Sequence, residues 1–522
     1  MEVTSPSSLW KDFDVTALPL NVSELSAKTE SGSAVKELYF DGLSTTDGRV
    51  RAYMKILENT GDKGVILYLP DKNGSTDDDT AQSFYALGYT VATLDYLGED
   101  DRNPRYTLYP KSLSLCNCRG MTTFTASDEA GNSPWYVWTC IARRAIMLLR
   151  RRYRQTMYAV GRGLGGCTVY KLSIFNEGLT ACATLLNVLP DIHGTNDNML
   201  NYRASMDNAA YASISTVPMF IAVASNDEDG SLDSMATLAS YTAALKTFRI
   251  VERAFSGGIK VVFPQIDRFF VGGAKKRSLP KVKAVNSENN LYFDISADDN
   301  GEDAPSFTDI RFFTAFCIEK PEYRNWTNIP LVSLGGKAFL ARADVLQSDK
   351  RVNGFVNVYD ENGDVSSSLL VSIIPKQLGI TPHQTIKRRL IYDGSMGCDV
   401  WTSPSGGNVS TKTGLYGIEG VYSDTYSLAT FKPGDLLYRA DGEVLLQIIA
   451  SGKPQTINIT VSDGSALYHC SVKINNSEDW HKFTLSNTDF KNSGGQLLGW
   501  NNVVMMAFDS DSEFLLSSIL WV

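Results

Sequence analysis

The first half of the chain alternates short apolar runs with longer stretches of helical spacing. The runs are rich in β-branched and aromatic residues and span 64–70, 90–95, 156–161, 181–188 and 217–225. Parallel strands covered on both faces show this pattern, because neither face needs polar side chains. Between them, residues 135–153 carry apolar side chains at helical spacing. We therefore predict an α/β domain with a mostly parallel sheet over residues 35–275, preceded by an N-terminal extension over 1–34.

The second half changes to short segments of alternating polarity, separated by turns of Asn, Asp, Gly and Ser. This pattern is typical of all-β domains. A segment bounded by prolines, 375–382, is the predicted linker. The predicted fold class is a multidomain protein, in which the α/β domain is followed by a β-sandwich at 276–382 and a jelly-roll domain at 383–522.

Composition limits the classes of partner. The 522 residues are 43% hydrophobic and 20% charged, with a net charge of −9. These values are typical of folded proteins, and without a dense basic tract they disfavour nucleic acid as a partner.

The basic run at 143–154 is expected to be the polar face of a surface helix. No apolar window approaches the length of a membrane span, and no export signal is visible, so a cytoplasmic protein, a virion-associated one and a chain without its signal all remain open.

Cysteine and histidine are too sparse to suggest a metal centre or a disulfide scaffold. Eight cysteines occur, and the four histidines are His193, His383, His469 and His481, without zinc-ligand spacing. Acidic clusters at 77–79, 298–303 and 509–513 lack the spacing of a calcium loop. No cofactor is predicted, with structural calcium as the alternative.

A glycine-rich turn follows the apolar run at 156–161. Its sequence is Gly161-Arg162-Gly163-Leu164-Gly165-Gly166, and a helical stretch comes next. The glycines fit a dinucleotide fingerprint, but several strands precede this one, whereas that fingerprint belongs to the first strand of its sheet. Lys171 stands too far along the chain for a phosphate-binding P-loop. The third interpretation is a nucleophile elbow, G-x-S-x-G, flanked by Gly161 and Gly165.

Residues 35–270 resemble the α/β-hydrolase fold, in particular its acetyl-esterase and dienelactone-hydrolase-like branch. The resemblance depends on strand order, the elbow, the helix that begins at Trp135, and the loops YLPDKNG (68–74), LDYLGED (94–100) and ASNDEDG (224–230). It implies a serine at the elbow centre, an aspartate after a late strand and a histidine after the next. Here the centre is Gly163, the acid corresponds to Asp227, and 248–264 contains no histidine. The catalytic positions are therefore degenerate.

Two other residues of the predicted α/β domain could carry chemistry. His193 is its only histidine, and a shifted geometry would be needed to make it a base. Cys167 lies on the first turn of the helix after the elbow, without a positioned base. We expect a loop histidine and a packing thiol.

The C-terminal region, 386–522, resembles galactose-binding-like jelly rolls that serve as carbohydrate-binding modules. The resemblance depends on DWHKFTLSNTDFKNSGG (479–495) and the closing strand SSILWV (517–522). It implies aromatic side chains that stack on sugar rings. The candidate rings lie in a turn-rich segment and are Trp401, Tyr416, Tyr422 and Tyr426, whereas Trp480 and Trp521 are expected in the core.

Together these patterns predict a non-catalytic pseudo-hydrolase that binds carbohydrate or has a structural role, for example as a surface, appendage or virion component. The alternative is a carbohydrate acyl esterase with an unorthodox active site. The expected partner is a glycan, without nucleic acid and without membrane insertion. The oligomeric state is left open.

Overall fold

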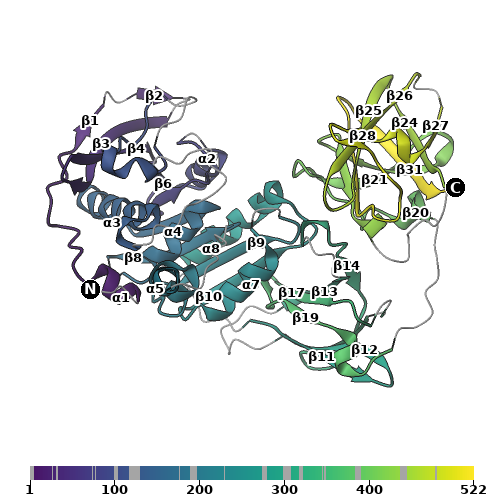
Figure 1. Cartoon of the computed structure of the whole chain (residues 1–522), viewed down its shortest axis with the longest axis horizontal. Coiled ribbons are helices and arrows are strands. Elements are labelled where there is room, and N and C mark those ends of the chain that lie inside the picture. Colours follow the sequence, from purple (N-terminus) through teal and green to yellow (C-terminus); the bar gives the residue numbers. More distant parts are fainter. Residues whose placement is uncertain are drawn as a thin grey trace.

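The protein consists of three successive units in this computed structural model (Figure 1). An α/β unit comes first, and a middle β unit and a C-terminal β unit follow. The structure describes residues 5–25, 28–30, 33–72, 74–76, 78–98, 104–116, 130–175, 177–187, 197–227, 230–272, 279–297, 307–316, 321–343, 345, 348–381, 390–434, 444–476 and 479–522.

The α/β unit is built on a ten-stranded mixed sheet. Its order is β1 (Ser23–Glu24), β3 (Ser33–Thr45), β4 (Gly48–Glu58), β6 (Thr90–Asp95), β5 (Val65–Leu69), β7 (Met157–Arg162), β8 (Leu179–Leu185), β9 (Met219–Ala224) and β10 (Lys246–Val251), with β2 (Lys28–Glu30) paired to β3. The strands from β6 to β10 run parallel, and β1, β3 and β4 are antiparallel. The parallel strands are almost continuously buried, as their apolar runs predict.

Helices cover both faces of this sheet. They are α1 (Pro6–Trp10), α2 (Asp79–Ala86), α3 (Pro134–Arg152), α4 (Leu164–Leu172), α5 (Asp197–Met206), α6 (Asn208–Ala212), α7 (Leu232–Tyr241) and α8 (Phe263–Val271). One core cluster joins one face of the sheet to α3, α4 and α7, and a second joins the other face to α2 and α8. The carboxyl ends of β5, β7, β9 and β10 therefore meet at one edge, where the connecting loops come together.

The prediction of a surface helix with an arginine face is wrong for two of the arginines on α3. Arg143 and Arg144 are buried. Arg144 donates to the backbone carbonyls of Asp41, Val15 and Leu18 at 2.7, 2.8 and 3.0 Å. The start of the chain covers this side of α3 and supplies the acceptors, which helical periodicity alone does not reveal.

The predicted N-terminal extension packs onto the α/β unit in its described part. The Trp10 indole donates to the Tyr211 hydroxyl at 2.7 Å and stacks on Tyr136 with ring centroids 4.6 Å apart. Further along, β1 and β2 pair with β3. These residues are thus continuous with the core of the α/β unit.

The middle unit contains two antiparallel sheets. One has the order β11 (Lys281–Ser287), β12 (Asn290–Ser296), β16 (Ala338–Ala343) and β15 (Leu331–Gly335), and the other has β14 (Thr327–Ile329), β13 (Phe307–Phe316), β17 (Val352–Asp360) and β18 (Val365–Ser367), with β19 (Val371–Ile373) on β17. This unit lies beside β10 (Figure 1). The Ile250 N–H donates to Ser367 Oγ at 2.7 Å, and Asn357 Nδ2 donates to the Ile250 carbonyl at 3.2 Å. Side chains of the middle unit therefore cap the edge strand of the large sheet.

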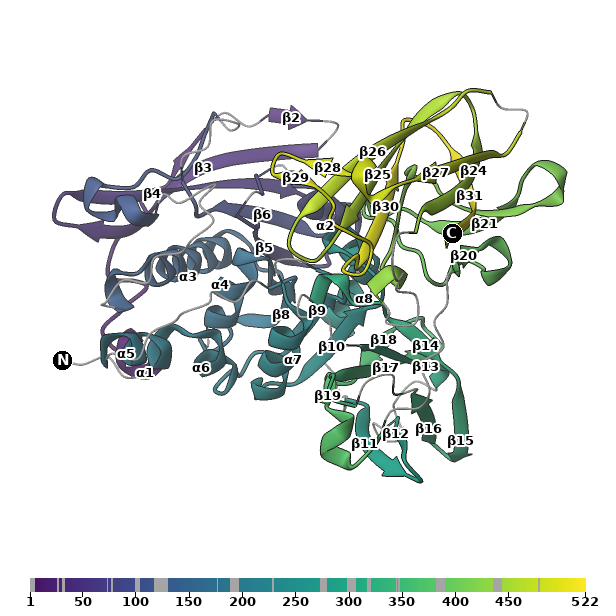
Figure 2. The ribbon, with the colours of Figure 1, turned by 45° about the vertical axis from the view of Figure 1, so that its right-hand side comes forward.

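The C-terminal unit also contains two antiparallel sheets. The first joins β20 (Leu390–Asp393), β21 (Val409–Thr413), β22 (Glu419–Ser423), β31 (Phe514–Trp521), β24 (Leu446–Gly452) and β27 (His481–Leu485). The second has the order β23 (Ser427–Thr430), β30 (Met505–Asp509), β25 (Gln455–Ser462), β26 (Leu467–Ile474), β28 (Lys491–Asn492) and β29 (Gly495–Gln496). A core cluster takes side chains from both sheets. Figure 2 shows the two sheets facing each other. The α/β fold followed by all-β units is confirmed, and the jelly-roll assignment stays a prediction.

Across the parts of the chain that the structure describes, no helix is long and apolar enough to cross a membrane.

Candidate functional site

The turn from β7 into α4 has the backbone shape of a nucleophile elbow. Gly163 caps α4 with φ +50° and ψ −117°, a conformation that residues with a side chain rarely adopt. A Cβ on Gly161 would overlap the Gly165 carbonyl, and one on Gly165 would overlap the Leu69 carbonyl. The flanking glycines are therefore required by close backbone packing, Gly161 within the turn and Gly165 against β5.

A carboxylate occupies the space beside Gly163 into which a nucleophile side chain would extend. A Cβ on Gly163 would overlap the carboxyl group of Asp71, which follows β5 directly. Asp71 Oδ1 accepts hydrogen bonds from the Leu164 N–H at 3.0 Å and from the Lys72 N–H at 2.7 Å. Both donors are backbone groups at the carboxyl edge of the sheet.

The positions of these two N–H groups are those that the resemblance to α/β-hydrolases assigns to an oxyanion hole. In α/β-hydrolases the hole combines the N–H of the residue after the nucleophile with one from the loop that follows an earlier strand. Leu164 follows the elbow centre, and Lys72 lies in the loop after β5. The protein's own negative oxygen therefore holds both donors, where a catalytic site would hold the developing oxyanion of the substrate.

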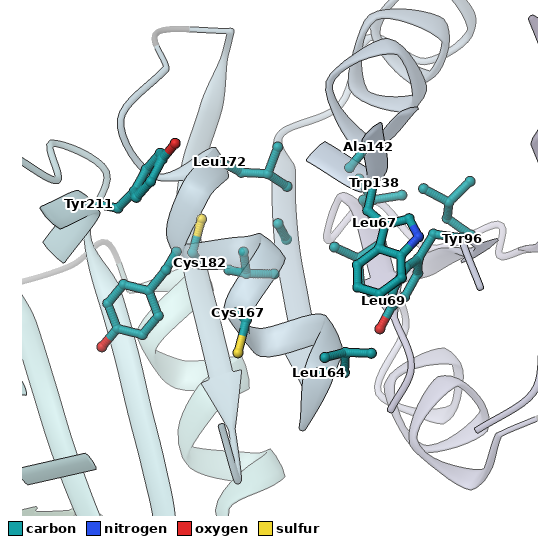
Figure 3. Close-up of a cluster of buried hydrophobic side chains, with 14 of the residues drawn as sticks. Leu67, Leu69, Tyr96, Trp138, Ala142, Leu164, Cys167, Leu172, Cys182 and Tyr211 are labelled. Carbon is teal, nitrogen blue, oxygen red and sulfur yellow. The ribbon is translucent and has the colours of Figure 1, made fainter. Parts of the chain in front are cut away.

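Two titratable side chains, Cys167 and Lys171, are buried behind the elbow. Cys167 is fully buried, and burial raises the pKa of its thiol to about 12. Its thiol donates to Asn187 Oδ1 at 3.0 Å, within the apolar cluster of Figure 3. Burial also lowers the pKa of Lys171 to about 8, and Lys171 Nζ donates to Asn208 Oδ1 at 2.8 Å. A thiol whose pKa is raised by burial does not react as a thiolate at neutral pH.

Asp227 lies where the resemblance places the acid, in the loop after β9. It is 5% exposed, and the Gly230 N–H donates to its Oδ2 at 2.7 Å. The loop after β10, which would carry the histidine, contains Phe255 and Ser256. Two histidines, 469 and 481, lie in the C-terminal unit, and the other two, 193 and 383, lie outside the described residues.

A cavity of about 380 Å³ opens where the three units meet. The α/β unit contributes Asp227, Phe255 and Ser256, and the middle unit contributes Tyr323. The C-terminal unit completes the wall with side chains from β25, β26 and β30, among them Asp509. The two loops from the α/β unit follow β9 and β10, so the cavity lies at the carboxyl edge of the large sheet, where open α/β sheets bind ligands.

Hydrogen bonds between the units hold the walls of this cavity. Asn226 Nδ2 donates to the carbonyls of Glu322 and Arg324 in the middle unit, both at 2.9 Å. The hydroxyl of Thr402 in the C-terminal unit donates to the Arg253 carbonyl at 2.5 Å. Asn226 is fully buried, so breaking its bonds would leave polar groups without partners. The cavity is thus a formed part of the fold.

The four candidate sugar platforms do not form one surface. Trp401 is 4% exposed and packs against Tyr392 and Phe508 at centroid distances of 5.1 and 5.9 Å. Its assignment as a solvent-facing ring is corrected, because the turn-rich segment folds inward and hydrogen-bonds to β23. Tyr416 and Tyr426, 76% and 39% exposed, lie beyond opposite ends of β22.

Tyr422 lies on β22 rather than in a loop, with Lys412 Nζ 5.6 Å from its ring centroid. The core position of Trp521 is confirmed at 1% exposure. Trp480 is half-buried, and its indole donates to the Leu415 carbonyl at 3.0 Å. The exposed tyrosines therefore do not form a continuous platform for a sugar chain.

Among the described residues no group of three His, Cys, Asp or Glu side chains is arranged to hold a metal ion. Of the acidic clusters considered for calcium, 298–303 and Asp77 lie outside the described residues. Structural calcium stays an untested alternative.

Comparisons with known proteins give likenesses of structure without likeness of sequence. No protein-family model and no curated protein matches the chain. An acetyl xylan esterase from Paenibacillus sp. R4 aligns with a TM-score of 0.40 and 12% identity over 50% of this chain and 90% of its own. Acetyl Xylan Esterase 1 from Thermoanaerobacterium sp. JW/SL YS485 aligns at 0.39 and 12%, over 52% and 95%. Est1E from Butyrivibrio proteoclasticus, with ferulic acid bound, aligns at 0.32 and 10%, over 48% and 98%. We base the α/β-hydrolase-like fold on the strand order and the elbow.

Sequence reasoning identified the elbow, Gly163 and the position of Asp227, but it missed Asp71. A signal was present, because the loop YLPDKNG was assigned to the oxyanion region and contains this aspartate. A glycine at the elbow centre leaves a space that close-packed proteins fill. The strand adjacency that brings Asp71 to this space is a tertiary property.

Proposed function

We propose that the chain is a non-catalytic protein on an α/β-hydrolase-like scaffold, and that it binds a carbohydrate. The observation that carries the non-catalytic part is Asp71. Its carboxylate lies where a nucleophile side chain would extend, and it accepts from the two N–H groups that an oxyanion would need. A site that already holds a negative oxygen has no free donors to stabilise an oxyanion on a substrate.

The carbohydrate part of the proposal has two supports. One is the resemblance of the C-terminal unit to carbohydrate-binding modules. The other is the lining of the cavity between the units, which combines carboxylates and hydroxyls with aromatic rings. Sugar sites are built from these two kinds of group, because one face of a sugar ring is apolar and its rim carries hydroxyls.

The second candidate function is a carbohydrate acyl esterase with an unorthodox nucleophile. The backbone of the elbow favours it, since Gly163 retains the strained conformation of the turn. Asp71 is the side chain that such an enzyme would have at the position of the nucleophile. A carboxylate can serve as a nucleophile in other enzymes, and removing it would then abolish turnover.

Hydrolysis of p-nitrophenyl acetate and of acetylated xylan separates the two candidates. We expect the intact chain to hydrolyse neither above the level of a heat-denatured control. Gly163→Ser should be equally inactive, because it adds a hydroxyl without a base and overlaps Asp71. Enzymatic turnover by the wild-type chain that disappears in Asp71→Asn would establish the esterase and exclude the non-catalytic proposal.

A further inference from the structure

We propose that the cavity between the three units is a binding site for a neutral sugar ring. The proposal rests on the carbohydrate part of the proposed function and names its site and the charge class of its ligand. It moves the site away from the loop aromatics of the C-terminal unit. It also makes binding a property of the assembled chain, since each unit supplies part of the wall.

The charges of the lining select the class of ligand. Asp227 and Asp509 are the titratable acids among the described lining residues, and no Lys, Arg or His accompanies them. Ionised carboxylates accept hydrogen bonds and repel anions. Acidic sugars, phosphates and nucleotides are therefore disfavoured, whereas hydroxyl groups, which donate, are suited to this lining.

The two carboxylates come from different units, which favours a polyol over a compact cation. Asp227 follows β9 in the α/β unit, and Asp509 ends β30 in the C-terminal unit. Ser256 and Thr460 add hydroxyls from these same two units. Acceptors supplied by two units suit a ring that carries hydroxyls around its rim, while an organic cation with a single charge needs only one carboxylate.

An apolar surface completes the match. Phe255 and Tyr323 line the cavity and both contact the ring of Phe431, with centroids 5.5 and 6.4 Å away. Met505 and Ala507 of β30 belong to the same small cluster. A lining that combines apolar side chains with polar acceptors offers a surface for stacking and several groups for the hydroxyl rim.

The volume fits one or two sugar rings. At about 380 Å³ the cavity lies near the lower end of the range for small-molecule sites, which runs from about 300 to 1,000 Å³. The hydrogen bonds of Asn226 and Thr402 hold its walls in place before a ligand enters. Little ordering is then required on binding, which favours affinity.

Titration calorimetry on the full chain tests the proposal. The neutral probes are xylotriose, cellotriose, maltotriose and triacetylchitotriose, with sialyllactose as the acidic probe and spermidine as the cationic one. Asp509→Asn removes one acceptor charge at an exposed strand end without changing the volume. Asp511→Asn is its matched control, since Asp511 is exposed two residues further on and does not line the cavity. Tyr416→Ala tests the exposed ring at the β21–β22 turn.

We expect at least one neutral probe to bind and sialyllactose to bind more weakly or not at all. Asp509→Asn should lower the affinity by about tenfold or more, the usual size of a lost hydrogen bond to a charged group. Asp511→Asn and Tyr416→Ala should leave the affinity within about twofold of wild type. Melting temperatures of all three variants should stay near that of wild type, which shows that the fold is retained.

Three results would overturn the proposal in distinguishable ways. Sugar binding that is insensitive to Asp509→Asn but lost in Tyr416→Ala would place the site on the C-terminal loops and leave the proposed function intact. Spermidine binding without any neutral sugar would overturn the ligand class. Failure of the wild-type chain to bind any glycan, on this panel and on a glycan array, would overturn the proposed carbohydrate function itself.

Discussion

The carboxyl edge of the large sheet has two regions that differ in how they are filled. In the first, which we call the closed region and which lies between the neighbouring central strands β5 and β7, Asp71 fills the elbow beside Gly163. In the second, the open region, the loops with Asp227 and Phe255 after β9 and β10 border a cavity shared by three units. The position at which hydrolases of this fold carry out chemistry is thus occupied from within, while free volume remains between the units.

This difference separates two properties of a hydrolase-like scaffold. The elbow backbone persists although its centre has no side chain, because Gly161 still allows close packing within the turn and Gly165 allows it against β5. The cavity has a different origin, since it depends on the middle and C-terminal units as well. A fold can therefore keep the shape of a catalytic turn while a cavity forms elsewhere along the same edge.

The largest effect is expected when a side chain is added in the closed region. Gly163→Ala should lower the free energy of unfolding by about 2 to 5 kcal/mol, because it combines a strained φ with overlap of the Asp71 carboxyl group. Urea denaturation measures the change. Gly499→Ala is the control, since its added Cβ would meet nothing within 4 Å. A Gly163→Ala protein as stable as wild type would show that Asp71 does not fill the closed region as described.

An intermediate effect is expected when the internal carboxylate is removed. Asp71→Ala leaves the Leu164 and Lys72 N–H groups without their acceptor and should cost about 1 to 3 kcal/mol. Asp71→Asn should cost less, because its amide oxygen can still accept. Added acetate should raise the melting temperature of Asp71→Ala and not that of wild type, since the vacated donors can bind a small carboxylate. Equal responses of both proteins to acetate would contradict an anion-binding pair of N–H groups in the closed region. Asp62→Ala, at an exposed position, is the control for the change in stability.

The smallest effect concerns Lys171, which is buried on α4, the helix that follows the elbow. Burial lowers its pKa in the folded chain to about 8, below the ordinary value of 10.5. Between these values the unfolded chain binds more protons than the folded chain, so this residue makes stability rise with pH. Relative to Lys171→Met, wild type should gain on the order of 1 to 2 kcal/mol between pH 7.5 and 9.5. Urea titrations at several pH values measure the difference in the free energy of unfolding, with exposed Lys473→Met as the control. A difference between wild type and Lys171→Met that does not change with pH would mean that Lys171 is not a buried cation.

Local pattern explains much of what the sequence revealed about the fold. The apolar runs predicted the parallel strands, because burial on both faces excludes polar positions from a strand. The spaced glycines predicted the elbow, because only residues without a side chain allow the contact with β5. The same reasoning was wrong for Arg144 and Trp401, since periodicity and turn residues do not show which other segment will cover a side chain.

By itself, the amino-acid sequence determined that the elbow centre, Gly163, has no side chain and that 248–264 has no histidine to act as a base. Only the tertiary structure decided what replaces the nucleophile. Leu69 pairs with Gly161. This adjacency of β5 and β7 brings Asp71 beside Gly163, which lies 92 positions later in the sequence. The cavity likewise joins Asp227, Tyr323 and Asp509, which no local pattern connects. Both outcomes depend on strand order and on packing between units, and these are long-range contacts that the hydrophobic period of a single segment does not encode.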